Sequence, residues 1–278
     1  MQKLFTSAIA ILFLVSIGLA CSLLRPKTPI TWHVILELDA AVPDREAAVS
    51  QIISVLERRL DAAGINNSRV AAEGAPSNGR IRVSLPDVAE RKRLTDLVTS
   101  EGKLELVSVV SPPSPNPVKT FSSEREALAF LGGTLPSNRR LLLCQERAEP
   151  TTAGNDPAAR QPPSQWVIIE APAVVDGREI QNARAISIGD EYGYHISFSL
   201  RPEGAQKFGA WTAANINNYL GVVLNGEVKS IAFIKSQIYD QGEISGRFTK
   251  QSAEDLALIL QTGALPAPVR IVETGDSK

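Results

Sequence analysis

The sequence has few of the side chains on which metal sites and disulfide scaffolds depend. Only two cysteines and two histidines occur among its 278 residues. Two cysteines are too few for a disulfide framework, and without a Cys/His cluster there is little material for a zinc site. Acidic and basic residues nearly balance, 30 against 29, so the sequence lacks the basic stripe of a general nucleic-acid binder. We therefore expect the protein to bind no metal, no cofactor and no nucleic acid.

Long apolar runs are scarce as well, and only the N-terminus carries one. It extends from Leu4 to Ala20 behind Lys3 and is near the lower length limit for a bilayer span. Two interpretations stay open for residues 1–21: a secretory signal peptide or an uncleaved membrane anchor. Residues 22–29, with two prolines, are expected to form a tether. Both interpretations place the body outside the cytoplasmic membrane and attach it there.

The end of this run, Gly18-Leu19-Ala20-Cys21, resembles the lipobox of bacterial lipoproteins, although Gly18 replaces the usual leucine. The resemblance implies lipid attachment at Cys21. The alternative is that Cys21 is an ordinary small apolar residue. We expect the protein on the extracytoplasmic (periplasmic) side of a bacterial membrane, anchored by lipidated Cys21 or by an uncleaved helix. Cys144 then has no disulfide partner in the chain, and its position after three leucines predicts a buried thiol.

Residues 30–110 predict a ferredoxin-like unit. Strands are expected at 34–38, 70–73, 81–85 and 104–109 because apolar and polar residues alternate there. Asp44 and Asp87 are candidate N-caps of two helices with apolar faces. The order is β-α-β-β-α-β, in which two helices cover one face of a four-stranded antiparallel sheet.

A second α+β unit is predicted after a proline-rich connection. The connection, residues 111–165, contains a short helix with Ser123 and Glu126 at capping-box spacing and a loop at 149–164 that we expect to be mobile. Residues 166–273 then read as strands and helices, with Asn225-Gly226 as the strongest hairpin signal. Residues 274–278 are expected to be a tail. The predicted fold class is thus α+β, a ferredoxin-like base followed by a second α+β unit.

Four strings within residues 174–273 carry a family resemblance. They occur in this order: Gly204-Ala205-Gln206-Lys207-Phe208, Val223-Leu224-Asn225-Gly226-Glu227-Val228-Lys229-Ser230, Ile244-Ser245-Gly246-Arg247-Phe248-Thr249 and Gly263-Ala264-Leu265-Pro266-Ala267-Pro268. This stretch resembles the head of the first large extracytoplasmic (P1) domain of SecD, a subunit of the bacterial SecDF protein-export complex. The string Leu56–Gly64 is similar to the base of the same domain, so the resemblance covers most of residues 34–273.

Two departures limit what the resemblance implies. SecD carries a glycine pair shortly after its first membrane helix, and Thr31–Leu36 has none. SecD also continues into five further membrane helices with its proton-pathway carboxylate, whereas this sequence ends at Lys278. The resemblance therefore implies a membrane-tethered extracytoplasmic module that binds unfolded or emerging polypeptide or Sec translocon subunits and assists export, without conducting protons itself. The alternative is an envelope lipoprotein that uses the fold as a scaffold or a small-ligand binder.

A hydrolytic site near His195 is a third hypothesis. Asp190 and Ser197 are close in sequence, but no Gly-x-Ser-x-Gly elbow is present. A histidine within an alternating strand is more often a packing or surface residue, and His33 has the same status. No metalloprotease, Walker or dinucleotide motif occurs. We expect the protein not to be an enzyme and predict no catalytic residue.

Overall fold

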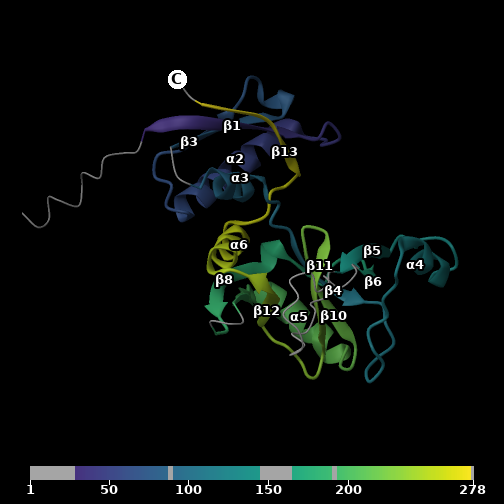
Figure 1. Ribbon diagram of the computed structural model, residues 1–278. Helices are drawn as coiled ribbons and strands as arrows, with labels where there is room; N and C mark the ends of the chain where they lie inside the picture. The colour runs from purple at the N-terminus through teal and green to yellow at the C-terminus, as the bar shows by residue number, and fades with distance from the viewer. Residues whose placement is uncertain (1–28, 87–89, 145–164, 190–192, 277–278) are drawn as a thin grey trace, which may run out of the picture.

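The computed structural model describes residues 29–86, 90–144, 165–189 and 193–276. It consists of two α+β units, of which the base contains both ends of the described chain and the head contains its middle part (Figure 1). The predicted α+β class, a base with a second unit, is confirmed. Residues 1–21 with Cys21, almost all of the tether and the loop 149–164 lie outside the described residues.

The base is a four-stranded antiparallel sheet with two helices on one face (Figure 1). The strand order is β13-β1-β3-β2. Its elements are β1 (Ile30–Leu38), α2 (Arg45–Ala62), β2 (Arg69–Ala72), β3 (Arg80–Pro86), α3 (Arg91–Thr99) and β13 (Val269–Asp276).

Helix α2 forms where the sequence predicts it. The side chain of Asp44 accepts a hydrogen bond from the backbone N–H of Ala47, which satisfies one of the unpaired donors at the helix start. The apolar stripe of the helix is buried against the sheet, and this contact forms the base core. That core contains Val34, Leu36, Leu38, Val49, Ile52, Leu56, Leu60, Ile81, Val83, Leu85, Leu94 and Val98.

The strand that completes the base corrects the sequence prediction. Leu104–Val109 was expected to be the fourth base strand, but as β4 it pairs with strands of the head. β13 takes the base position instead, antiparallel to β1 from Trp32↔Asp276 to Leu38↔Val269. β4 is buried on both faces, as is usual for a strand covered on both sides, whereas the described helices of the base lie on one face of its sheet. The base is therefore built from the first and last described segments of the chain.

The head contains a small closed sheet. Strands β10 (Tyr219–Leu224), β11 (Glu227–Phe233), β5 (Arg139–Cys144), β6 (Gln165–Glu170) and β4 (Leu104–Val109) follow one another, and β4 pairs back with β10. β7 (Val175–Asp176) adds to β4, and α4 (Glu124–Phe130) packs on β6. The interior of the closed sheet is a cluster of Val107, Cys144, Val167, Ile169, Val223 and Val228. Cys144 is thus buried, as predicted.

The other layer of the head is a three-stranded antiparallel sheet with two helices. The sheet has the order β12-β9-β8, formed by β8 (Ile180–Ser187), β9 (Tyr194–Leu200) and β12 (Gln241–Phe248). Helices α5 (Pro202–Ala214) and α6 (Lys250–Thr262) pack against it. The core shared by this sheet and the two helices includes Leu104 and Leu106 of β4, whose side chains lie outside the interior of the closed sheet. β4 therefore joins both layers of the head.

The predicted hairpin between β10 and β11 is confirmed. Asn225 and Gly226 both have positive φ, 51° and 80°, as a type I′ turn requires. The turn lies against the chain that enters the head, since the backbone N–H of Asn225 donates to the Lys103 carbonyl and its side chain accepts from the Lys103 N–H, 2.9 Å in each case. The hairpin tip thus reaches the junction of base and head.

Candidate functional site: the groove between base and head

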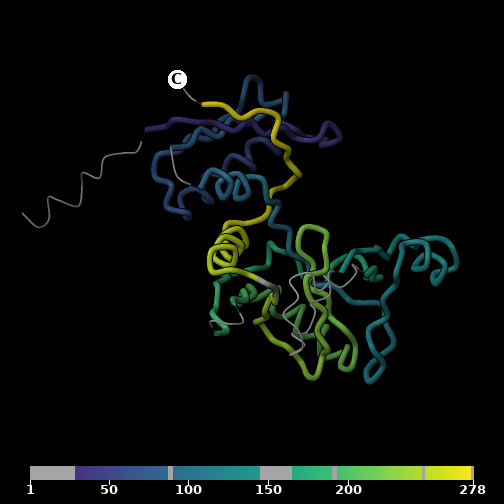
Figure 2. The backbone as a smooth tube through the Cα atoms, viewed as in Figure 1, coloured from purple at the N-terminus to yellow at the C-terminus, as the bar shows by residue number. Residues whose placement is uncertain are grey.

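Two segments of chain connect the base to the head, and a groove opens beside them. The outgoing segment is Ser100–Lys103, and the return segment is Gly263–Pro268; Figure 2 traces the chain along both. The two segments are hydrogen-bonded, because the Leu265 N–H donates to the Glu101 carbonyl at 2.8 Å. The groove has a volume of about 900 Å³, which is in the range of sites that bind ligands.

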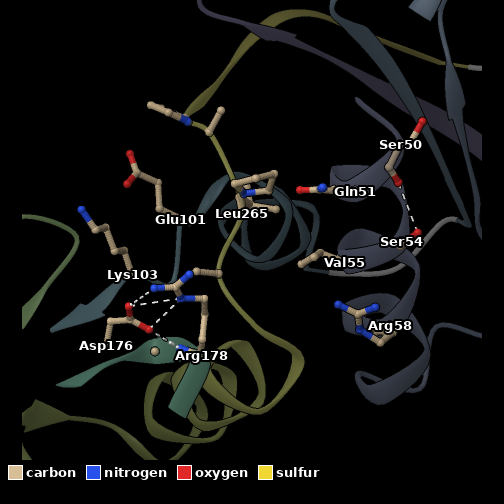
Figure 3. A pocket seen from close by; sticks show the side chains of 15 residues that line it. Ser50, Gln51, Ser54, Val55, Arg58, Glu101, Lys103, Asp176, Arg178 and Leu265 are labelled. Atoms are coloured by element: carbon tan, nitrogen blue, oxygen red, sulfur yellow. Dashed lines mark hydrogen bonds and ion pairs between the residues drawn. The ribbon is translucent and has the colours of Figure 1, made fainter. Parts of the chain in front are cut away.

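The return segment runs between the two walls of the groove (Figure 3). Helix α6 ends at Gly263, whose φ of 98° favours glycine. Beyond it the side chains alternate: Leu265 and Ala267 are buried in the base core, whereas Pro266 and Pro268 are exposed. The floor of the groove therefore presents proline rings, which carry no backbone N–H.

One wall is the exposed side of α2. Ser50, Ser54 and Arg58 follow one another at four-residue spacing, so they lie along one helix face (Figure 3). The two hydroxyls donate to the carbonyls of Glu46 and Ser50 within the helix, at 3.1 and 3.2 Å. The Arg58 guanidinium donates to the Thr262 carbonyl at the end of α6. This wall is therefore polar, and the Arg58 guanidinium places one positive charge at the junction of base and head.

The opposite wall carries both signs of charge. Glu101 and Lys103 come from the outgoing segment, and Asp176 and Arg178 from the turn after β7 (Figure 3). Arg178 donates to both carboxylate oxygens of Asp176, and this hydrogen bonding holds the pKa of Asp176 below its usual range, against the opposing effect of partial burial. The Lys103 ammonium lies 3.6 Å from the Glu105 carboxylate. Arg178 and Lys103 stay exposed, 89% and 54% of their side-chain surface.

A buried arginine fixes the crossing of the two segments. Arg59 of α2 has no exposed surface, and its guanidinium donates to four backbone carbonyls, those of Leu97, Ser100, Glu101 and Gly263, at 2.6 to 3.2 Å. Its positive charge thus meets the C-terminal ends of α3 and α6, where carbonyls are unpaired and cations are favoured. Burial, with a smaller contribution from Arg58, lowers the pKa of Arg59 to about 10, so the guanidinium stays charged at neutral pH.

A second contact joins the helices of the two units. Arg93 of α3 donates to both carboxylate oxygens of Asp255 in α6, at 2.7 to 3.0 Å. The bidentate geometry is the strong form of this ion pair, and the hydrogen bonds to Asp255, opposed by partial desolvation, raise the pKa of Arg93. Together with Arg59 it sets the orientation of the head on the base.

The structure places each of the two histidines singled out in the sequence next to a glutamate. His195 lies on β9 with Nε2 3.6 Å from Glu243 Oε1, while Asp190 lies outside the described residues. His33 lies on β1, 3.5 Å from Glu273. Within the ranges that the structure describes, no three His, Cys, Asp or Glu side chains form a group that could hold a metal ion. None of the described helices is long and apolar enough to cross a membrane.

Sequence reasoning missed the groove and Arg59. Its place in the last turn of α2 favours only an interaction with the end of its own helix, but Arg59 lies on the apolar face of α2, one turn after Val55 and seven residues after Ile52. That spacing was the available signal for an inward-facing arginine. No local sequence pattern indicates the groove, because the residues that line it come from four separate stretches of the sequence.

Two family descriptions match this chain. Residues 49–111 match "Protein translocase subunit SecDF, P1 domain, N-terminal", and residues 154–267 match "SecDF, P1 head subdomain". The two matches cover parts of the base and of the head, in the order expected from the motifs.

Curated relatives are similar over most of the chain. The protein translocase subunit SecD of Koribacter versatilis is 31% identical over 229 residues, which is 82% of this chain and 39% of that protein. SecD of Elusimicrobium minutum is 32% identical over 250 residues, 86% of this chain and 50% of that protein. The chain thus spans half or less of the length of these relatives.

Solved structures show the same fold. The crystal structure of SecDF in its super-membrane-facing form is 23% identical, with a TM-score of 0.63 over 96% of this chain and 35% of that one. A structure described as a membrane component SecDF that enhances protein export is 25% identical, with a TM-score of 0.60 over 87% of this chain and 98% of that one. By sequence motifs, family matches and fold, this chain belongs to the SecD family and contains its P1 domain, base and head.

Proposed function

We propose that this protein is an extracytoplasmic, membrane-tethered SecD-like module that binds polypeptide or translocon components and thereby assists protein export. In this proposal it acts by binding and not by catalysis. The observation that carries the proposal is the position of the last of the four family strings, whose residues 264–268 form the floor of the open groove between the two units.

The location of the chain ends supports a tether at the base. β1 begins at Ile30, directly after the proposed tether, and β13 ends at Asp276 in the same sheet (Figure 1). An N-terminal segment held in the membrane by lipidated Cys21 or by an uncleaved helix therefore joins the protein at the base. The head and the groove follow later in the chain. Such tethering raises the effective concentration of the groove at the membrane surface.

The composition of the groove favours polypeptide over a small apolar ligand. A small-ligand binder is expected to have a deep apolar pocket. The fifteen lining residues instead include five charged and three further polar side chains, and the groove is open to solvent. An extended chain, with its row of backbone carbonyls, can use the cations Arg58, Lys103 and Arg178 as hydrogen-bond donors.

Site-specific photo-crosslinking in living cells tests the proposal. A photoreactive residue replaces Gln51, which is exposed and lines the groove; a second variant carries it at Lys229, beside the hairpin tip. The matched control replaces Glu57, which is exposed on the same helix but does not line the groove.

We expect adducts with secreted precursors or translocon subunits from the position at Gln51, and fewer from the position at Glu57. Equal adducts from both positions would remove the groove from the proposal. Adducts with unrelated envelope proteins alone would overturn the export function and favour the scaffold alternative.

A further inference from the structure

We infer that the groove selects polypeptide segments that carry aromatic side chains, which stack on the rings of Pro266 and Pro268. This inference rests on the proposed function, since it names the kind of polypeptide that the groove takes. It commits to one occupant, an extended segment with at least one Phe, Tyr or Trp.

The floor of the groove supplies the first argument. Pro266 and Pro268 are both exposed and flank the buried Ala267, so both rings belong to the exposed side of the return segment. Pro-rich segments are bound elsewhere by aromatic side chains that pack on the proline rings. Here the prolines are part of the receptor, so the aromatic group must be part of the ligand.

The composition of the walls supplies the second argument. None of the fifteen residues that line the groove is aromatic, and three of them are cations: Arg58, Lys103 and Arg178. Arg178 and Lys103 expose more than half of their side-chain surface. A cation next to an aromatic face is attracted by the ring quadrupole, and the groove has no ring of its own to use this attraction.

These features separate an aromatic segment from an aliphatic one of similar hydrophobicity. Leucine side chains would bury apolar area on the proline rings but have no π face for the three cations. A cation–π contact at an exposed site corresponds to about a twofold to fivefold difference in Kd, that is about 0.5–1 kcal/mol.

The test compares two peptides on the full-length protein in mild detergent, with protein-free detergent as the blank. One labelled, unfolded peptide carries phenylalanine at every fourth position, and the other carries leucine at the same positions. Fluorescence anisotropy gives both Kd values for the wild type and for the Pro266→Ala and Pro268→Ala variants. Pro136→Ala is the control, because Pro136 is exposed in the head and does not line the groove.

We expect the phenylalanine peptide to bind at least about twofold more tightly to the wild type, and each groove variant to reduce that preference while Pro136→Ala leaves it unchanged. Equal affinity for both peptides, or a groove variant that weakens both to the same extent, overturns the aromatic preference and leaves the proposed function standing. Absence of binding for both peptides overturns polypeptide binding itself. A misfolded variant is recognised by its lower Tm, and Arg58→Gln then serves as the alternative test of the cation contribution.

Discussion

The base and the head close their cores in different ways. The head core is formed by one continuous stretch of chain between the outgoing and return segments, and its central strand β4 is buried on both faces. The base core is formed by residues before the head and is completed by β13 after it, while in the described part of the chain one face of its sheet has no helix. The head can therefore keep its core without the base strands, whereas the base depends on the chain that returns from the head.

Removal of β13 is the strongest way to test this difference. A chain that ends after Pro268 loses every pairing of β13 with β1 and leaves β1 as an unpaired edge. We expect amide hydrogen exchange in β1 to accelerate by at least about tenfold, because local opening of the base becomes easier, while β9 in the head keeps its protection. Equal acceleration in β9 would show that the two units unfold together and would contradict the comparison.

Arg59 tests the joint between the two units. Replacement by methionine keeps the aliphatic part of the side chain but removes the hydrogen bonds that the guanidinium donates to four carbonyls near the crossing. We expect a loss of about 3 kcal/mol in the free energy of unfolding, since several buried hydrogen bonds to a charged group disappear at once. Chemical denaturation measures it, with Arg58→Met as the control, because Arg58 is exposed and donates to Thr262. Similar losses in the free energy of unfolding for Arg59→Met and Arg58→Met would show that the buried hydrogen bonds of Arg59 do not dominate the stability of the joint.

The smallest expected effect on stability comes from comparing two arginine–glutamate ion pairs, one in the head and one in the base. In the head, Glu105 accepts from Arg140 at 2.8 and 3.0 Å, and only 7% of its side chain is exposed. In the base, Glu73 accepts from Arg82 at 2.7 and 2.9 Å, with 33% exposed. Burial raises the pKa of Glu105, but the hydrogen bonds and charge of Arg140, with Lys103, outweigh it and hold the pKa below its ordinary value. Arg82 likewise lowers the pKa of Glu73.

A carboxylate with a lowered pKa stabilises the fold above the ordinary carboxyl pKa, and this contribution disappears as the pH falls through the folded-state value. We therefore expect Glu105→Gln to cost about 2 kcal/mol at pH 7 and Glu73→Gln less than about 1 kcal/mol, because its pair is screened by solvent. Thermal unfolding at pH 7 and pH 3 measures both, and the difference from the wild type should shrink at pH 3. A larger effect at Glu73 would contradict the role of burial.

The sequence predicted most elements because their signals are local. Asp44 as N-cap, the short helix after Ser123 and the Asn225-Gly226 turn each depend on residues a few positions apart, and all three are found in the structure. The motif strings also identified the family, which the comparisons confirm.

The pairing of strands was less predictable, because pairing is set by tertiary contacts. Leu104–Val109 and Val269–Glu273 both read as extended segments, and no local signal says which of them lies beside β1. The deciding property is that β4 is apolar on both faces, which suits an interior strand, whereas β13 is largely exposed and suits an edge. The groove shows the same limit, since four separate stretches line it.

The pairing of Trp32 with Asp276 has a consequence for biosynthesis. Chains emerge from the ribosome N-terminus first, and domains fold as their residues become available. The first strand of the base is made before the head, but its antiparallel neighbour on one side is made after it. The head can therefore reach its native core while the base still lacks an edge strand, and completion of the base waits for the last described residues of the chain, as expected for a contact of high sequence separation.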